Sequence, residues 1–132
     1  MKFEEALQSA IYERLSTYPG MPPVYDDVPQ GAPSLYVVIG EDTHVPWDTD
    51  DSVGSESTIT IHQWDKAYRG KARIKQTQGF IYEALNRHEL SVPGYNLVTL
   101  EFEYSESVLD PDGVTRHGVV RYRALVEEST AS

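Results

Sequence analysis

The chain has 132 residues, which is about the length of one domain, and its hydrophobic fraction of 39% is enough for a packed core. A formal net charge of -10 argues against a partner that is recognised mainly through its phosphates, such as duplex nucleic acid. The lack of cysteine excludes disulfides, cysteine zinc sites, thiol nucleophiles and iron–sulfur clusters.

The first half of the chain predicts one helix and two strands. Apolar residues recur at three- and four-residue steps from residue 3 to residue 18, which is typical of a helix with one buried stripe, and Pro19-Gly20 ends it. Residues 21–33 carry four prolines and predict an extended connector with room for a short strand. The apolar run at residues 35–39 predicts a central strand, and residues 41–55 predict a long polar loop. The alternation at residues 56–64 predicts the next strand.

The second half predicts one helix and a long hairpin. Helical spacing of apolar residues predicts a helix over residues 71–87. Period-two patterns follow at residues 96–106 and 114–127, and the turn sequence at residues 110–113 joins them as an antiparallel hairpin. Residues 128–132 are expected to form a frayed tail at the carboxyl terminus.

The order α-β-β-α-β-β predicts an α+β fold with one antiparallel or mixed sheet of about four strands. We expect both helices to cover a single face of this sheet and leave the other face free for contacts. Residues 1–127 should form one domain. No apolar run approaches the ~20 residues of a membrane span, and the amino terminus lacks the apolar stretch of a secretion signal. We therefore expect a protein that is cytosolic where it is made.

Charge is distributed unevenly along the chain. Residues 1–65 contain 12 acids and 2 bases, whereas residues 66–132 contain 9 of each. An acidic block at residues 41–51 has no base, and a basic block at residues 66–75 has no acid. The two blocks are either solvated surfaces that aid solubility or complementary patches used in self-association.

An apolar anchor lies inside the acidic block. Val45, Pro46 and Trp47 are surrounded by polar residues, and an indole in such a segment packs either on its own domain or on a neighbouring chain. The candidate interface residues are therefore this anchor, the acids beside it and the bases expected to meet them on the next subunit: Val45, Pro46, Trp47, Asp48, Asp50, Asp51, Arg69, Lys71, Arg73 and Lys75. A contact between two unlike patches either closes into a ring or continues as a filament.

Nothing in the sequence predicts a catalytic, cofactor or metal site. No two of His44, His62, His88 and His117 are spaced for a metal site on one helix or hairpin. The acidic stretch from residue 48 to residue 54 only faintly resembles a calcium loop, because Val53 and Ile59 stand where Gly and Glu are needed. Nucleophile-elbow and phosphate-loop motifs are absent from the sequence.

Several segments resemble the tail-completion, or tail-terminator, family of long-tailed phages and gene transfer agents. The likeness covers residues 3–127. The segment Val24–Pro33, followed by Leu35–Asp42, is similar to the family pattern VPQGA and then PYVVIGE, with Leu35 where a proline is usual. Further matches follow in order, at residues 54–64, at Gly70, at residues 110–113 and at residues 117–119.

The resemblance implies a structural virion protein without an active site. It implies a ring, usually of six subunits, that caps the tail tube, stops its elongation and joins the tail to the head connector. The expected partners are therefore further copies of the chain, the tail tube protein and the connector. DNA would only pass through the lumen, and neither a membrane nor a small-molecule substrate is expected. The alternatives are a different neck adaptor, or a small-ligand module or minor enzyme with a pocket on the free sheet face near His62 and Trp64.

Overall fold

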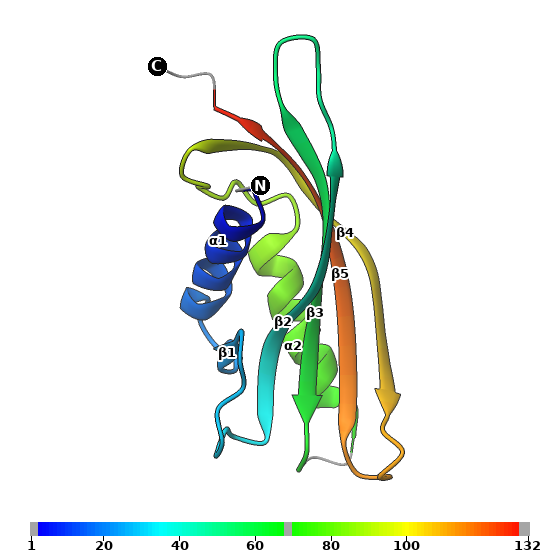
Figure 1. Ribbon diagram of the computed structural model, residues 1–132. Coiled ribbons are helices and arrows are strands. Elements are labelled where there is room, and N and C mark those ends of the chain that lie inside the picture. The colour runs from blue at the N-terminus through cyan, green and yellow to red at the C-terminus, as the bar shows by residue number, and fades with distance from the viewer. Residues whose placement is uncertain (1–2, 68–69, 130–132) are drawn as a thin grey trace.

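The computed structural model describes residues 3–67 and 70–129 (Figure 1). Two helices and five strands follow one another in chain order: α1 (Phe3–Thr17), β1 (Val24–Tyr25), β2 (Leu35–Pro46), β3 (Gly54–Asp65), α2 (Ala72–Leu85), β4 (Tyr95–Leu109) and β5 (Arg116–Glu128).

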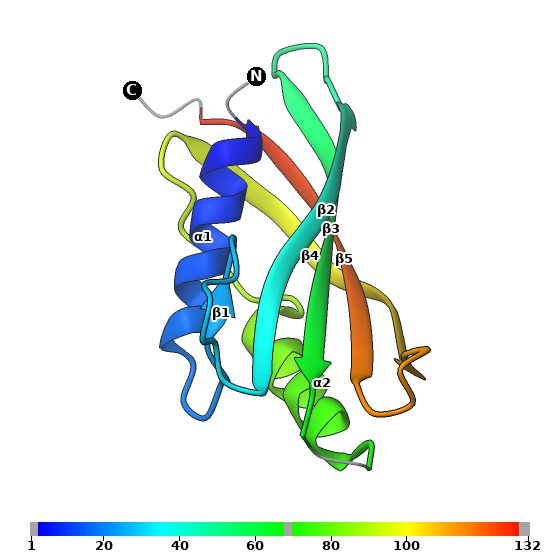
Figure 2. The same cartoon turned by 60° about the horizontal axis from the view of Figure 1, so that its bottom comes forward.

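The strands form one mixed sheet in the order β1-β2-β3-β5-β4. Only β1 and β2 run parallel, and the other neighbours are antiparallel. Both helices lie on the same face of the sheet (Figures 1 and 2). The predicted α+β class, the single sheet and the one-sided helices are therefore confirmed. The sheet has one strand more than the sequence predicted, because Val24 and Tyr25 pair with Val37 and Val38.

The core lies between the helices and the sheet. Along β3, Ile59 and Ile61 are buried against the helices, whereas Thr58, Thr60 and His62 alternate onto the open face. The same alternation buries every second residue of β5 from Gly118 to Val126. Both helices bury one apolar stripe each, which accounts for the helical spacing in the sequence.

The prediction of a long loop over residues 41–55 is wrong for residues 41–46. Strand β2 continues to Pro46, with a register shift between Ile39 and Asp42. Polar cross-strand pairs hold this extension, since the hydroxyls of Thr43 and Thr58 lie 2.5 Å apart. The strand that begins at Leu35 lies inside the sheet, between β1 and β3, as predicted.

The carboxyl-terminal residues are joined to the sheet as far as the structure describes them. Glu128 ends β5 and its N–H donates to the carbonyl of Val53, while the N–H of Ser129 donates to Gly94. Residues 130–132 of the predicted frayed tail lie outside the described residues.

Candidate subunit interface

The end of β2 (Val45 and Pro46) and the segment that joins it to β3 form a projecting hairpin, which we call the arm (residues 45–53). It extends beyond the rest of the molecule at the top of Figure 1. The N–H of Trp47 donates to the Gly54 carbonyl at 3.0 Å, and that of Thr49 donates to the Ser52 carbonyl at 2.9 Å. The two sides of the arm are therefore hydrogen-bonded to each other beyond the ends of β2 and β3.

The arm exposes both apolar and acidic side chains. Val45 is 51% exposed, and Val53 is exposed to a similar degree. Trp47 is half-buried, and its ring edge lies against Gly54. Trp47 therefore packs in part on its own chain, and the rest of its surface is open to a neighbour.

The acids of the arm cluster around its turn. Asp50 and Asp51 occupy the two turn positions between Thr49 and Ser52. Asp48 accepts a hydrogen bond from the Gly54 N–H at 3.0 Å. All three carboxylates remain exposed, so the end of the arm carries a concentrated negative charge.

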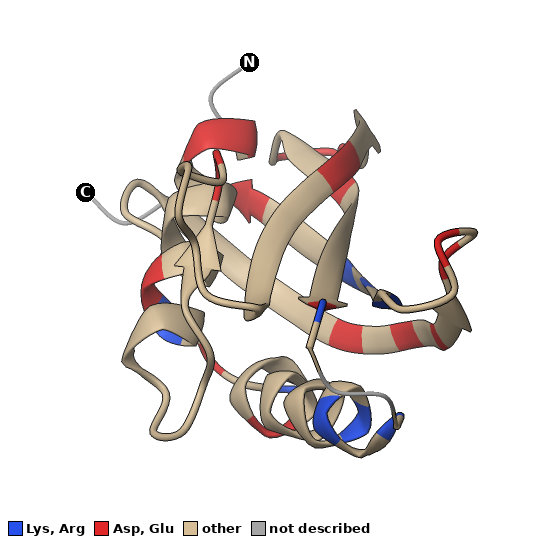
Figure 3. Ribbon diagram, turned by 90° about the horizontal axis from the view of Figure 1, so that it is seen from below, with Lys and Arg blue, Asp and Glu red and all other residues tan. Residues whose placement is uncertain are grey.

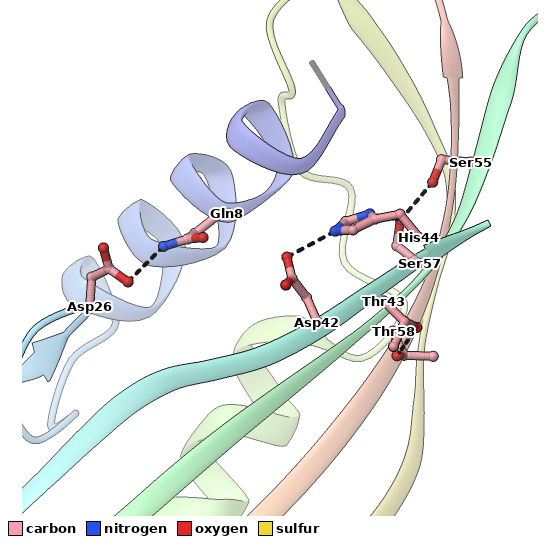
Figure 4. Close-up of polar contacts among 8 residues, drawn as sticks. All are labelled: Gln8, Asp26, Asp42, Thr43, His44, Ser55, Ser57 and Thr58. Atoms are coloured by element: carbon pink, nitrogen blue, oxygen red, sulfur yellow. Dashed lines mark hydrogen bonds and ion pairs between the residues drawn. The ribbon is translucent and has the colours of Figure 1, made fainter. Parts of the chain in front are cut away.

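A polar network holds the base of the arm (Figure 4). His44 lies between the Asp42 carboxylate, 2.8 Å from its Nε2, and the Ser57 hydroxyl, 2.7 Å from its Nδ1. The Ser57 hydroxyl also lies 3.0 Å from that of Ser55. The Asp–His–Ser order is that of a hydrolase triad, but Ser57 is fully buried and the adjoining hollow measures only about 10 Å³. The network therefore fixes the two strands to each other and offers no access to a substrate.

The basic block lies at the start of α2, at the opposite end of the molecule from the arm (Figures 1 and 3). Lys71 and Lys75 are exposed. Arg73 is engaged within the chain, since its Nε lies 3.3 Å from the carboxylate of Asp65, which is fully buried. Arg69, which was also predicted at the interface, lies outside the described residues.

The candidate acidic residues therefore lie together on the arm and the described candidate basic residues lie together at the start of α2, but the two blocks are far from each other. The arm and the start of α2 occupy opposite ends of the long axis in Figure 1. The two blocks of one copy therefore do not meet each other. Charges of opposite sign at two ends suit a heterologous, head-to-tail interface.

On the open face of the sheet, Glu41, His62 and His117 form a hydrogen-bonded row of side chains that sequence reasoning missed. Glu41 lies 2.7 Å from His62 Nε2, and His62 Nδ1 lies 2.7 Å from His117 Nε2. His117 stacks on Trp64 with ring centroids 3.8 Å apart. The histidines are far apart in sequence and meet only because β3 pairs with β5, so their spacing gave no signal.

These contacts shift two pKa values. The hydrogen bond with His62 lowers the pKa of Glu41. Burial lowers the pKa of His117, and the neighbouring His62 lowers it further. Among the described residues, no group of three or more histidine or carboxylate side chains is placed to hold a metal ion.

Two broad hollows lie on the helical side of the sheet, away from the row formed by Glu41, His62 and His117. One of about 770 Å³ is lined by α1 residues such as Tyr12 and by Asp26. The other, of about 640 Å³, lies between α1 and the start of β4. Neither involves His62 or Trp64, which the small-ligand alternative requires. Within the described residues, neither helix is long and apolar enough to cross a membrane.

A sequence model of the family described as "Tail completion protein gp17" matches residues 9–127. The chain belongs to the tail completion protein gp17 family. The resemblance drawn from the sequence motifs is therefore confirmed, and the match spans α1 from residue 9 onward, all of α2 and the sheet up to residue 127.

Similar proteins come from a phage and from a gene transfer agent. The "Tail completion protein gp17" of Bacillus phage SPP1 is 29% identical in an alignment of 128 residues that covers 94% of this chain and 94% of that one. Its solved structure, "Structure of bacteriophage SPP1 gp17 protein", has a TM-score of 0.62 at 30% identity and covers 91% of this chain and 88% of that one. A chain of "Virion of native gene transfer agent (GTA) particle" has a TM-score of 0.83 at 26% identity and covers 94% of this chain and 96% of that one.

Proposed function

We propose that this protein is the tail terminator of a phage or gene transfer agent particle. Copies of the chain form a ring, usually of six subunits, that caps the tail tube, stops its elongation and joins the tail to the head connector. The protein would act as a structural component of the virion, at the end of the tail next to the head, after assembly in the host cytoplasm. Membership of the tail completion family supports this role.

One structural observation supports the proposal that the copies form a ring. The arm, with Asp48, Asp50 and Asp51, and the exposed Lys71 and Lys75 of α2 are complementary but lie at opposite ends of one chain. Each copy then has one acidic and one basic end, and repeated head-to-tail contacts close into a ring when the rotation between copies allows it. Arg69 and Arg73 are proposed to add to the basic end, although Arg73 also neutralises Asp65.

The ring would stop growth by presenting different faces to its two neighbours. One face takes the place of the next layer of tail tube subunits, so that no further tube protein can add. The opposite face meets the connector. Acidic side chains around the channel would let DNA pass without adhering, because they repel phosphates.

The mass of the native assembly tests the ring. We expect native mass spectrometry and particle images of the purified protein, alone or with tail tubes, to give closed rings. Lys75→Glu should weaken the assembly more at low salt than at high salt, because salt screens exposed charge pairs. Gln76→Glu, on the neighbouring exposed position of α2, is the matched control and should have little effect.

Some results would contradict the proposal. A chain that stays monomeric in every condition and never limits tube growth would overturn the terminator role. A loss of assembly in Lys75→Glu that is the same at all salt concentrations would show that charge is not the cause. Particles that lack this chain separate the terminator from another neck adaptor: overlong tails support termination, whereas normal tails without heads support joining alone.

A further inference from the structure

An aromatic surface lies where α2 meets the edge strand β4. Tyr82 is 47% exposed and Phe102 is 40% exposed. Their rings meet edge to face with centroids 5.7 Å apart, and Phe102 makes a similar contact with the buried ring of Tyr122. We call Tyr82 and Phe102 the aromatic ledge.

The ledge is held in place from both sides. The Asn86 side-chain amide donates to the Tyr82 hydroxyl at 3.1 Å, and its carbonyl oxygen accepts from the Phe102 N–H at 2.9 Å. Tyr122 supports Phe102 from the core. Rigid, exposed aromatic side chains lose little entropy on binding, and such residues dominate the affinity of protein interfaces.

Two lysines lie in line with the ledge. Lys75, Gln78 and Tyr82 follow one another at steps of three and four residues, which places them on one side of α2, and Lys71, the N-cap of the helix, comes four residues before Lys75. This side faces β4, since the Gln78 amide donates to the Glu106 carbonyl at 2.9 Å. The stripe thus offers apolar surface at the ledge and positive charge further toward the start of the helix.

We propose that this stripe is the docking surface for the arm of a second copy of the chain. The exposed Val45 and Pro46 of the arm pack on Tyr82 and Phe102, and the acids at its turn meet Lys75 and Lys71. This inference rests on the proposed self-association and names the receptor that the charge blocks alone do not define. It adds Tyr82 and Phe102 to the interface.

The distance between the apolar and the charged side chains is similar on the arm and on the stripe. An extended strand rises about 3.3 Å per residue, so Val45 and Asp48 lie about 10 Å apart along the arm. A helix rises about 1.5 Å per residue, so Tyr82 and Lys75 also lie about 10 Å apart along α2. Apolar and charged contacts can therefore form together. The arm and the stripe are also complementary in sign, since residues 41–51 contain no base.

The absence of cysteine from the natural sequence allows a direct test. Thr49→Cys places a thiol at the end of the arm, and Ser105→Cys places one on β4 beside the stripe; both positions are exposed. The two single variants are mixed and treated with a short bis-maleimide. Ser9→Cys on the exposed side of α1 replaces Ser105→Cys in the matched control.

We expect cross-linked dimers from the Thr49 and Ser105 variants and only background from the control pair. Tyr82→Ala should lower the association constant about thirtyfold, as for a central aromatic residue of an interface. This loss should persist at high salt, whereas the effect of Lys75→Glu should fade. Circular dichroism of Tyr82→Ala checks that the chain still folds.

The outcomes separate this inference from the ring itself. Intact rings with no cross-link between Thr49 and Ser105, or with no effect of Tyr82→Ala, would overturn the docking surface and leave the ring standing. Wild-type protein that neither assembles nor cross-links would overturn both. A cross-link within one copy, detected as a monomer in a double Thr49→Cys and Ser105→Cys variant at high dilution, would also refute the docking surface.

Discussion

Gly118 on β5 provides the sharpest test of how α2 is held on the sheet. A Cβ atom added there would lie 2.5 Å from Gln63 Oε1, 2.7 Å from Ile74 Cγ2 and 2.8 Å from Gln78 Nε2. Gln63 and Ile74 are fully buried, so neither can move aside into solvent. We expect Gly118→Ala to force α2 away from β3 and β5.

The cost follows from these contacts. Overpacking by one methyl group costs about 1–3 kcal/mol. The 3.0 Å hydrogen bond between Gln78 Nε2 and Gln63 Oε1 would also be strained, and a buried amide that loses a partner costs about 1–3 kcal/mol. We therefore expect a loss of about 2–4 kcal/mol in the free energy of unfolding, measured by urea denaturation of the wild type and the variant.

Gly79 is the matched control, because the same substitution within α2 meets nothing within 4 Å. Gly79→Ala should stabilise the protein by about 0.5–1 kcal/mol, since glycine disfavours a helix interior. A Gly118→Ala variant as stable as the wild type would refute the reasoning, because it would show that α2 can shift at no cost.

Two further predictions concern titratable groups, Tyr122 in the core and His117 on the open face of the sheet. The Tyr122 hydroxyl is buried and has no hydrogen-bond partner among the described residues, so Tyr122→Phe should leave the free energy of unfolding unchanged or raise it by up to about 1 kcal/mol. The pKa of His117 lies below its usual value of 6.5, so acid protonates the unfolded chain first, and stability should fall as the pH drops below about 6.5. His117→Phe keeps a ring against Trp64 but cannot titrate, and it should flatten this part of the profile of stability against pH.

A specific result would contradict each of the predictions for Tyr122 and His117. A loss of more than 1 kcal/mol in Tyr122→Phe would mean that the hydroxyl has a partner, such as a bound water. The pH profile has a second contribution at lower pH, because the pKa of Glu41 is also lowered and its stabilisation is lost as the carboxylate is protonated. If His117→Phe keeps the full slope between pH 5 and 7, which is about the range where histidine titrates, another group is responsible.

Much of the fold was predictable because the signals are local. The apolar stripes of α1 and α2 have helical period and the alternation in β5 has period two, so one face of each of these elements had to be buried. The alternation at residues 96–106 predicted the strand β4, but Leu100 is its only buried residue, and Val98, Phe102 and Tyr104 are exposed. The turn at residues 110–113 joins the last two strands as predicted. The extension of β2 to Pro46 was not predictable, because residues 41–44 are polar and the extension depends on pairing with β3.

The candidate interface divides in the same way. The sequence by itself determined that the chain carries an apolar anchor at Val45–Trp47, an acidic block and a basic block, because these are properties of composition along a short segment. Only the tertiary structure decided that the arm projects from one end and that Lys71 and Lys75 lie at the other. Strand register and helix packing also placed Tyr82 beside Phe102, and Asp65 beside Arg73. Residues far apart in sequence meet through long-range packing, and no local pattern contains that information.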